Sequence, residues 1–486
     1  MAGGSVTATV RDDPPNPIKE NEMPLSAKKP GRPHYPVHGA PIHHEHELRL
    51  PMHALRDSGM TESAAYELIS SELLLDGQAR LNLATFVTTW MPSMAAKLMA
   101  DTADKNMIDK DEYPETANIE ARCVNILANL WNSPASDNAT GCSTTGSSEA
   151  AMLAGLALKW RWRERMKAAG KSTDKPNLVT GTNVQVCWEK FMRYWDVEPK
   201  LVPMEGDRYH LMPEQAAAAC DENTIGVVAV LGSTFDGSYE PVKEIAAALD
   251  TLEADTGCYV PMHVDGASGG FVAPFLQPDL EWDFRIARVQ SINASGHKYG
   301  LVYPGVGWAV WRDEAALPKD LIFDVNYLGG HMPTFALNFS RPGSEVIAQY
   351  FMFASLGREG YRRVLQNAQD VAVHLSEGIA EIGPYELISE GNELPVFAFT
   401  LKPDVTNYTV FDVSDRLRQS GWLVPAYSFP ENRQDLNVLR IVVRAGMNHE
   451  MADLLLEHLH KHTAFLESLS SPLPSPDTEK RKAFAH

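Results

Sequence analysis

Short apolar runs alternate with helical patterns through the middle of the chain. The runs with strand character are 177–180, 184–188, 226–230, 260–264 and 289–292. Several of them are separated by stretches in which apolar residues recur every three to four positions, as on a helix with one buried face. This alternation predicts an α/β fold with a mostly parallel, doubly wound sheet. Ligands bind such sheets at the carboxyl ends of the strands.

Helical patterns dominate on both sides of this region. Before it, Thr61 is a candidate N-cap, and helices are predicted at 81–100 and 117–131. The elements predicted after it are a long helix near 344–382, strands at 396–401 and 438–444, and helices at 410–420 and 450–468. The later group predicts a second, smaller α+β domain.

At 486 residues the chain is long enough for two or three domains. The predicted division is a Pro- and His-rich arm at 1–48, a helical segment at 49–80, a large domain at 81–368, a small C-terminal domain at 369–469 and a tail at 470–486. The arm and the tail have little to bury, so both are predicted to be flexible. The histidines of the arm are His34, His38, His43, His44 and His46. We interpret them as a solvated tract, or as a pH-responsive arm, in preference to a metal site.

Composition and charge narrow the classes of partner. The formal net charge of −20 argues against nucleic acid and gives no attraction to anionic membranes. A basic, aromatic stretch at 159–167 continues a helical pattern and is interpreted as a solvated or subunit-facing helix. The five cysteines show no CxxC spacing, which favours reduced thiols in a cytoplasmic protein over a disulfide framework or a zinc site. We therefore predict no metal, no nucleic acid and no membrane partner.

A lysine follows the last strand candidate of the central region. Lys298 stands between His297 and a Tyr-Gly turn, where a lysine has little structural use. In a partly desolvated pocket a lysine loses its proton more easily and forms a Schiff base with a carbonyl. Asp265 lies at the end of the preceding strand candidate. A lysine for an aldehyde and a carboxylate for a protonated pyridine nitrogen predict a pyridoxal 5'-phosphate (PLP) site.

A phosphate-binding turn is predicted upstream of these two residues. Residues 141–150 read Gly-Cys-Ser-Thr-Thr-Gly-Ser-Ser-Glu-Ala and open into a predicted helix at 151–167. Ser147 and Ser148 therefore lie at a helix N-terminus, where backbone N–H groups and the helix dipole favour an anion. The same residues also suit an N-cap with Glu149 in the first turn and no ligand. The glycine spacing resembles a P-loop, but the lysine is missing, which disfavours an NTPase.

Residues 266–270 match the Gly-x-Ser-x-Gly pattern of hydrolase nucleophiles. That motif requires a helix directly after the serine. Here Phe-Val-Ala-Pro follows, and its proline argues against a long helix at this point. The small residues beside Asp265 better suit a flat ring lying against the backbone, so a serine hydrolase is disfavoured.

Six motifs carry a family resemblance. They are Asn-Leu-Ala-Thr-Phe (82–86), Thr-Gly-Ser-Ser-Glu-Ala (145–150), Val-Gln-Val-Cys-Trp (184–188), His-Val-Asp-Gly-Ala-Ser-Gly-Gly (263–270), Ser-Gly-His-Lys (295–298) and Asn-Phe-Ser-Arg-Pro (338–342). From about residue 55 to 468 the chain resembles the bacterial and plant glutamate decarboxylases, which are group II PLP-dependent decarboxylases of fold type I. The resemblance implies an aspartate aminotransferase-like α/β fold, with a mostly parallel seven-stranded sheet in the large domain and a smaller α+β C-terminal domain. One departure is Gly266, where relatives often carry alanine.

The resemblance also implies roles for individual residues. Its catalytic residues are Lys298, which carries the Schiff base, Asp265, which pairs with the pyridine nitrogen, and His297. The implied cofactor-binding residues are Gln185 and Ala267 on the ring faces, Thr234 near the ring substituents, Ser147, Ser148, Ser295 and His297 at the phosphate, and Ser340 from a neighbouring subunit. The implied substrate-binding residues are Thr85, Asn106 and Asp109 for the distal carboxylate of glutamate and Arg440 for its α-carboxylate.

The implied activity is the conversion of L-glutamate to 4-aminobutyrate and CO2 by a cytoplasmic homo-oligomer, a dimer at least or a hexamer. Decarboxylases for aspartate or for aromatic amino acids are the nearest alternatives. An aminotransferase is disfavoured by the Ser-x-His-Lys arrangement, and a catalytically silent scaffold by the intact Lys298 and Asp265. The end of the chain, with Phe484 but no tryptophan, argues against calmodulin binding. Its Phe-Ala-His terminus resembles the histidine-bearing tails with which some bacterial relatives close the active site at neutral pH.

Overall fold

The structure, a computed structural model, describes residues 50–55, 57–325, 332–471 and 473. Contacts divide the chain into two units, Met1–Asp76 and Gly77–His486. In the first unit, α1 (Glu62–Leu73) begins where the N-cap Thr61 accepts the N–H of Ala64 at 3.3 Å, as predicted. None of the α1 side chains is buried. The histidine cluster of the arm and nearly all of the predicted tail lie outside the described residues.

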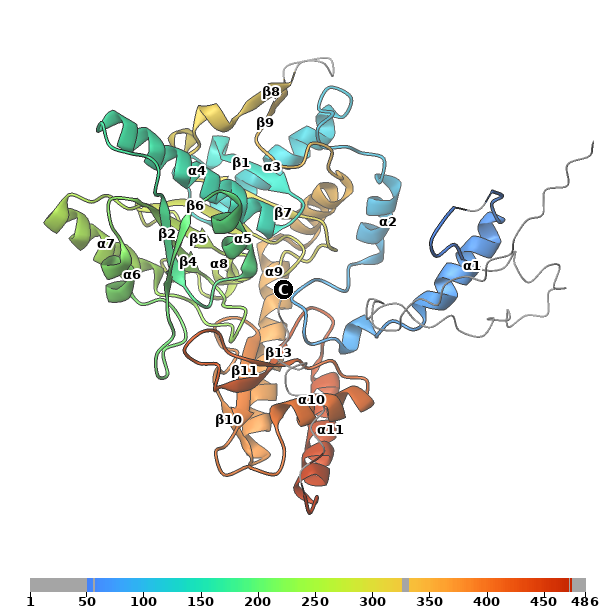
Figure 1. The fold of residues 1–486 in the computed structure, drawn as a ribbon. Coiled ribbons are helices and arrows are strands. Elements are labelled where there is room, and N and C mark those ends of the chain that lie inside the picture. The colour runs from blue at the N-terminus through green and yellow to red at the C-terminus, as the bar shows by residue number, and fades with distance from the viewer. Residues whose placement is uncertain (1–49, 56, 326–331, 472, 474–486) are drawn as a thin grey trace, which may run out of the picture. The chain divides into compact units, whose positions relative to one another are not determined.

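The second unit is built on a seven-stranded sheet with the order β1-β7-β6-β5-β4-β2-β3 (Figure 1). Its strands are β1 (Thr140–Thr144), β2 (Asn177–Gly181), β3 (Glu198–Val202), β4 (Thr224–Val230), β5 (Met262–Asp265), β6 (Val289–Ala294) and β7 (Gly307–Trp311). β7 pairs antiparallel with both of its neighbours, β1 and β6, and the other strand pairs of this sheet are parallel. The mostly parallel sheet is therefore confirmed, and it includes β1, β3 and β7, which the apolar pattern alone did not predict.

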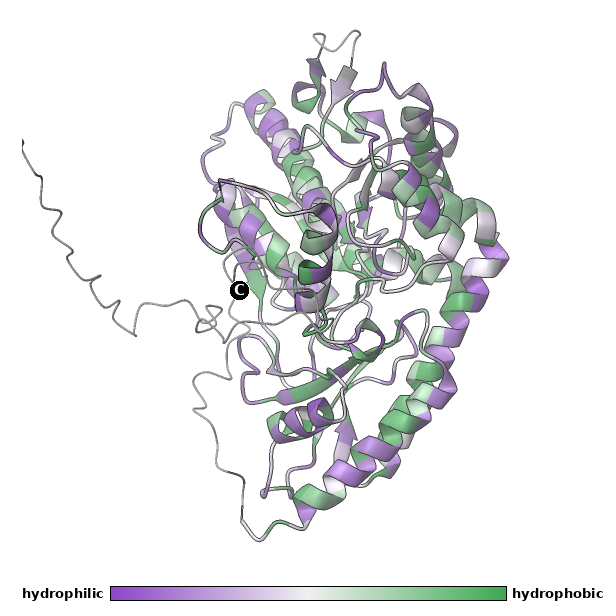
Figure 2. Cartoon of the chain, turned by 90° about the vertical axis from the view of Figure 1, so that its right-hand side faces the viewer, coloured by the Kyte–Doolittle hydropathy of each residue, from purple (hydrophilic) through white to green (hydrophobic). Residues whose placement is uncertain are grey.

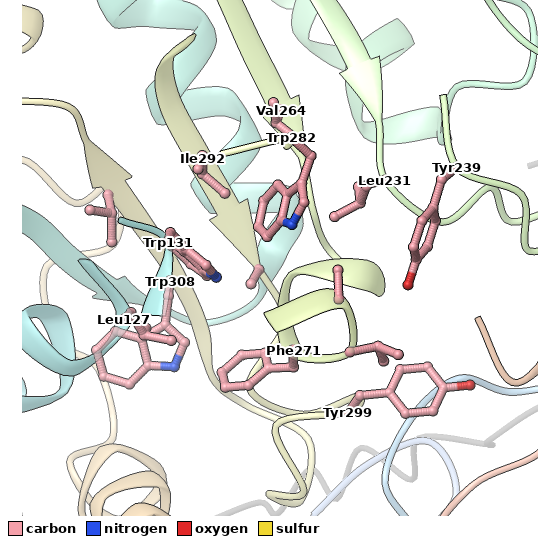
Figure 3. Close-up of a cluster of buried hydrophobic side chains, with 14 of the residues drawn as sticks. Leu127, Trp131, Leu231, Tyr239, Val264, Phe271, Trp282, Ile292, Tyr299 and Trp308 are labelled. Carbon is pink, nitrogen blue, oxygen red and sulfur yellow. The ribbon is translucent and has the colours of Figure 1, made fainter. Parts of the chain in front are cut away.

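Helices cover both faces of this sheet. The helices between β1 and β7, with the two before them, are α2 (Ser93–Asp101), α3 (Pro114–Leu130), α4 (Ser147–Ala168), α5 (Val186–Tyr194), α6 (Pro213–Ala219), α7 (Val242–Thr256) and α8 (Ala273–Leu276). Alternate residues of β4 belong to different cores: Val228 and Val230 pack with α4 and α5, while Val227 and Ala229 pack with α3 and α7. Figure 3 shows part of the core that contains Val227 and Ala229, in which Trp131, Phe271 and Trp308 are fully buried.

The C-terminal elements form a separate layer. The long helix α9 (Ser344–Glu381) is interrupted at Gly357, whose φ of 57° is not helical. An antiparallel sheet of order β10-β11-β13-β12 follows, with its own buried cluster. Its elements are β10 (Tyr385–Leu387), β11 (Val396–Leu401), α10 (Val410–Gln419), β12 (Ala426–Ser428), β13 (Asn437–Val442) and α11 (His449–Glu467). Figure 2 shows hydrophobic and hydrophilic positions alternating along α9, the pattern of a helix with one buried side.

Shorter elements complete the fold. The strands β8 (Phe323–Val325) and β9 (Met332–Thr334) pair as an antiparallel ribbon. The 3-10 turns are Ala79–Leu81, Ser136–Asn138, Gly269–Phe271, Glu314–Ala316 and Lys319–Leu321. Among the helices of the described ranges, none combines the length and the apolar composition needed to cross a membrane.

Two sequence predictions about local structure are wrong. The predicted strand at 184–188 instead starts α5, because the Gln185 side chain accepts the N–H of Cys187 at 2.7 Å and caps the helix. Its apolar residues are buried at helical spacing, and a short apolar run does not distinguish strand from helix. The predicted helix at 81–100 begins only at Ser93. Before it the backbone bonds to distant segments, for example from Thr88 N–H to the carbonyl of His297 at 2.7 Å.

Candidate active site

A cavity of about 320 Å³ opens where β4, β5 and β6 end. Its lining residues are Thr145, Gly146, Ser147, Ser148, Glu149, Asn183, Gln185, Cys187, Val230, Gly232, Thr234, Asp265, Ala267, Ser268, His297 and Lys298. Eight of the predicted site residues are in this set: Ser147, Ser148, Gln185, Thr234, Asp265, Ala267, His297 and Lys298. The position agrees with the rule that sheets of this kind bind ligands at strand carboxyl ends.

Lys298 lies in the turn after β6, and its amine faces both polar and aromatic groups. The Nζ atom donates to Ser268 Oγ at 3.2 Å and lies 5.0 Å from the centre of the Phe86 ring. The carbonyl of Lys298 accepts the Thr88 hydroxyl at 2.6 Å, which fixes the backbone of the turn. Burial lowers the pKa of Lys298, against the opposing attraction of Asp265. A lysine with a lowered pKa offers more of the neutral, nucleophilic amine.

Asp265 ends β5 and is held by three N–H donors. Its Oδ1 accepts the N–H of Ala267 and Nδ2 of Asn293, each at 3.1 Å, and its Oδ2 accepts Nε1 of Trp188 at 2.8 Å. A carboxylate has about four acceptor sites. Within the part of the chain that the structure describes, one site on Oδ2 is therefore left for a ligand. The side chain is 5% exposed and lines the cavity, so a donor there would be well shielded from water.

A buried histidine stands behind this carboxylate. His263 is fully buried, with Nε2 at 2.7 Å from Asn293 Oδ1 and Nδ1 at 2.8 Å from Ser291 Oγ. Burial lowers its pKa to about 4, so the imidazole is neutral at pH 7. Because Asn293 donates through Nδ2 to Asp265, its Oδ1 is the acceptor for His263, which places the imidazole proton on Nε2. A hydrogen-bonded chain thus runs from His263 through Asn293 to Asp265.

The predicted phosphate-binding turn comes directly before α4. Ser147 and Ser148 are the first two residues of α4, and the Ser295 hydroxyl donates to Ser147 Oγ at 2.6 Å. Ser295 supports the turn but does not line the cavity. His297 packs beside Gly146, where an added Cβ would lie 3.0 Å from Cε1 of the imidazole. Burial, helped by the charge of Lys298, lowers the pKa of His297 to about 4.

Arg440 on β13 contacts the same aromatic ring, Phe86, as Lys298. Its guanidinium donates to the carbonyl of Ala84 at 2.6 Å and to the carbonyl of Thr234. It also lies 4.9 Å from the centre of the Phe86 ring, the ring that faces Lys298. Among the described atoms its Nε has no hydrogen-bond partner. Thr85 follows Ala84 directly in the sequence, and its hydroxyl accepts the N–H of Val87 at 3.1 Å.

Three predicted residues gather in a separate group that does not line the cavity of this chain. Asn106 Nδ2 donates to Asp109 Oδ2 at 3.0 Å and to Ser340 Oγ at 3.3 Å. Asn106 Oδ1 accepts the N–H of Arg341 at 3.1 Å. The sequence prediction assigned Ser340 to a neighbouring subunit and Asn106 and Asp109 to the substrate, and the structure of one chain places all three together.

Several residues of the site were not predicted individually. Trp188, Asn293, His263, Ser268 and Phe86 all contact Asp265 or Lys298 directly or through one neighbour. One signal was present in the sequence: polar residues occupy alternate positions of two buried strands, 263 and 265 in β5 and 291 and 293 in β6. Side chains two apart on a strand share a face, so this pattern predicts a polar cluster inside the sheet.

Comparison with known proteins agrees with the site. The model of the pyridoxal-dependent decarboxylase conserved domain matches residues 56–402. This chain therefore belongs to the family of pyridoxal-dependent decarboxylases. It is 56% identical to a glutamate decarboxylase of Aliivibrio fischeri over 417 residues, which cover 85% of this chain and 89% of the relative. It is 50% identical to glutamate decarboxylase 5 of Arabidopsis thaliana, over 87% of this chain and 86% of the relative.

Solved structures give the same result. A glutamate decarboxylase of Lactobacillus brevis superposes with a TM-score of 0.84 at 46% identity, covering 87% of this chain and 96% of that chain. A sphingosine-1-phosphate lyase of Burkholderia pseudomallei, at 21% identity and a TM-score of 0.71, shares the fold. The resemblance found in the six motifs is thereby confirmed, together with the type I α/β fold and the dependence on PLP.

Proposed function

We propose that this chain is a PLP-dependent carboxy-lyase that converts L-glutamate to 4-aminobutyrate and CO2. The observation that carries the proposal is the placement of Lys298 and Asp265 in one cavity beside a turn of phosphate-type donors. Bacterial and plant glutamate decarboxylases that are 49–56% identical to this chain, over 85–88% of its length, support glutamate as the substrate. An aminotransferase or a serine hydrolase has no comparable support.

The residues around the cavity fit PLP. The volume of about 320 Å³ lies within the usual range of small-molecule sites. Asp265 keeps one acceptor site for the ring nitrogen, and Lys298 provides the amine that attaches the aldehyde. Ser147, Ser148 and His297, with Ser295 in support, would hold the phosphate. Gln185 and Ala267 would cover the two ring faces, and Thr234 would lie near the ring substituents.

Bound PLP supplies an electron sink for the pair of electrons left at the α-carbon when CO2 departs. The chain has to provide three things around it. Asp265 holds a proton at the ring nitrogen by charge-assisted hydrogen bonding. Lys298 supplies an amine in a site sheltered from bulk water. Arg440, whose Nε has no hydrogen-bond partner among the described atoms, would orient the α-carboxylate without binding it so tightly that loss of CO2 is opposed.

For the distal carboxylate we propose Thr85, Asn106 and Asp109. The separate position of Asn106, Asp109 and Ser340 fits a homo-oligomer of at least two subunits in which these residues serve a neighbouring site. We further propose a cytoplasmic location. The five cysteines support it, because all of them are free thiols, as is usual in a reducing compartment.

The test is an absorbance spectrum of the purified protein, followed by a substrate panel. Wild type should show the near-ultraviolet and visible band of lysine-bound PLP, and Lys298→Ala should lose it while keeping the thermal unfolding profile of wild type freed of cofactor. Release of CO2 should be fastest with glutamate, compared with aspartate and an aromatic amino acid. A protein that never takes up PLP would contradict the proposal, and a preference for aspartate would leave the cofactor assignment intact but overturn the substrate.

A further inference from the structure

A buried carboxylate that the mechanism does not use stands beside the proposed phosphate-binding turn. Glu149 lies in the first turn of α4 and is 6% exposed. Its Oε2 accepts the N–H and the hydroxyl of Thr145, at 2.8 and 3.0 Å, and Nδ2 of Asn338 at 3.2 Å. Its Oε1 accepts the backbone N–H groups of Leu337 at 2.9 Å and Asn338 at 3.2 Å. Five donors thus use all of its acceptor capacity.

These bonds fix one side of the turn 145–148. The other sides are fixed by close packing. A Cβ added to Gly307 of β7 would lie 2.3 Å from the carbonyl carbon of Gly146 and 2.5 Å from the nitrogen of Ser147. A Cβ added to Gly146 would lie 3.0 Å from the His297 ring. The turn therefore has no room to shift towards β7 or His297, and Glu149 ties its start to the segment 337–338.

The chemistry of Glu149 sets two effects against each other. A negative charge beside an anion site repels the anion, which weakens phosphate binding. A carboxylate also accepts from every direction, which glutamine does not: in either orientation its NH2 group would face at least two of the five donors. If position matters more than charge, then losing the carboxylate should weaken phosphate binding; if charge matters more, it should strengthen it.

We propose that Glu149 is a positioning residue for the phosphate of the cofactor. It holds the turn 145–148 so that the donors of Ser147 and Ser148 converge on one point, and this effect outweighs its own repulsion of the phosphate. The inference rests on the proposed function, because it takes the turn as the phosphate site. It assigns a role to a residue that, by the sequence alone, would serve equally well as a simple helix cap.

The test compares two ligands in the full-length chain freed of cofactor. PLP and pyridoxal share the ring and the aldehyde that reacts with Lys298, but pyridoxal lacks the phosphate. Both are titrated into wild type and Glu149→Gln, and binding is followed by absorbance. The expected loss of PLP affinity in the variant is about ten-fold or more, the scale of a disrupted hydrogen-bond set on a charged group, whereas the affinity for pyridoxal should change less than about three-fold.

The chain offers a matched control at another helix. Asp412 of α10 accepts the N–H of Thr409 at 2.9 Å and its hydroxyl at 2.7 Å, the same pair of bonds that Glu149 makes with Thr145. Asp412→Asn should lower thermal stability and leave the ratio of the two affinities unchanged. If Glu149→Gln does not fold, Asn338→Ala replaces it, since it removes one side-chain donor and should reduce the same ratio by about two- to five-fold.

Two results would overturn the inference: tighter PLP binding by Glu149→Gln, or an unchanged ratio of PLP affinity to pyridoxal affinity in the variant that folds, whether both affinities fall equally or neither changes. Either result counts only if wild type, titrated in parallel, binds PLP more tightly than pyridoxal. Failure of wild type to bind either ligand would instead overturn the proposed function, so the two failures are told apart by the wild-type titration alone.

Discussion

Two buried carboxylates line the same cavity, and they differ in how much of their hydrogen-bonding capacity the chain itself uses. Within the described ranges, Asp265 accepts three N–H donors and keeps one site on Oδ2 for a ligand. Glu149 accepts five donors and keeps none. Both are nearly inaccessible to solvent, at 5% and 6% exposure, so burial does not distinguish them.

The difference teaches that spare acceptor capacity separates a carboxylate that meets a ligand from one that shapes the site. Asp265 ends a central strand, where its donors come from Trp188, Asn293 and its own turn, all rigidly placed by the sheet and α5. Glu149 is placed at a helix start, where the donors are backbone and side-chain groups of loop residues 145 and 337–338. Removing the first should affect chemistry, and removing the second should affect cofactor affinity.

The largest expected effect is that of Asp265→Asn. The amide has no charge to hold a proton on the ring nitrogen, and its NH2 group would face existing N–H donors in either orientation. We expect the rate of CO2 release to fall by at least about 10²–10³-fold, the scale seen when a preorganised electrostatic partner is removed. Single-turnover measurement with saturating PLP checks this. A loss below ten-fold would show that Asp265 acts as Glu149 does, by shaping the site.

The next effect is on the pH dependence of stability, because Asp265 is linked through Asn293 to a buried, neutral histidine, His263. The pKa of His263 is about 4 in the folded chain, below its ordinary value of 6.5. The unfolded chain therefore binds an extra proton between these values, and stability falls as pH decreases from 6.5 to 4. The total is roughly 3 kcal/mol, from about 1.4 kcal/mol per pKa unit. Urea unfolding of wild type and His263→Gln across this range should show the stability difference shrinking towards acid pH.

Glu240 is a control of opposite sign. It is 2% exposed, and burial raises its pKa from 4.5 to about 7. The folded chain binds the extra proton here, so its contribution to stability is lost as pH rises from 4.5 to 7. As pH rises, wild type should therefore lose stability relative to Glu240→Gln. Parallel curves for both variants would mean that neither group titrates as its burial indicates.

A smaller effect is expected from Trp188→Phe, which removes one donor from Asp265 and retains an aromatic ring. The lost bond, at 2.8 Å to a charged acceptor, is worth about 1.5–3 kcal/mol, so catalysis should fall by roughly 10–100-fold. Trp162→Phe is the matched control. Trp162 is 1% exposed, and its Nε1 donates to the backbone carbonyl of Glu222 at 3.0 Å. Both variants should lose stability, and only Trp188→Phe should lose activity.

The sequence allowed much of this site to be predicted, for reasons that are local. Lys298 and Asp265 stand at the ends of apolar strands, and strand ends in a parallel sheet converge, so their meeting follows from the pattern. Ser147 and Ser148 follow in the same way from a helix start. The fold class was predictable because the strand-helix alternation is strong in the central region.

What the sequence did not predict depends on contacts between distant segments. The residues 82–92 carry a helical pattern, but their backbone is bonded to the turn of Lys298 and to the C-terminal layer, and these bonds exclude a helix. The role of Trp188 needs α5 to start where Gln185 caps it, which the apolar run 184–188 conceals. The number of donors on each carboxylate is likewise a tertiary property, so Asp265 and Glu149 could not be separated by spacing alone.

The smallest expected effect is that of Ser268→Ala, which removes the hydroxyl that contacts the amine of Lys298. Its hydroxyl accepts from Lys298 Nζ at 3.2 Å and is 2% exposed. Loss of this long bond should cost about 0.5–1.5 kcal/mol, hence less than about ten-fold in PLP affinity or in the rate of CO2 release.

If Ser268 were instead the nucleophile of a hydrolase, its hydroxyl would be indispensable for activity. The short helix α8 after Ser268 disfavours that role, since the hydrolase motif needs a long helix at this point. Complete loss of activity in Ser268→Ala, with PLP still bound, would show that the hydroxyl takes part in the chemistry and that Asp265 and Lys298 are not sufficient.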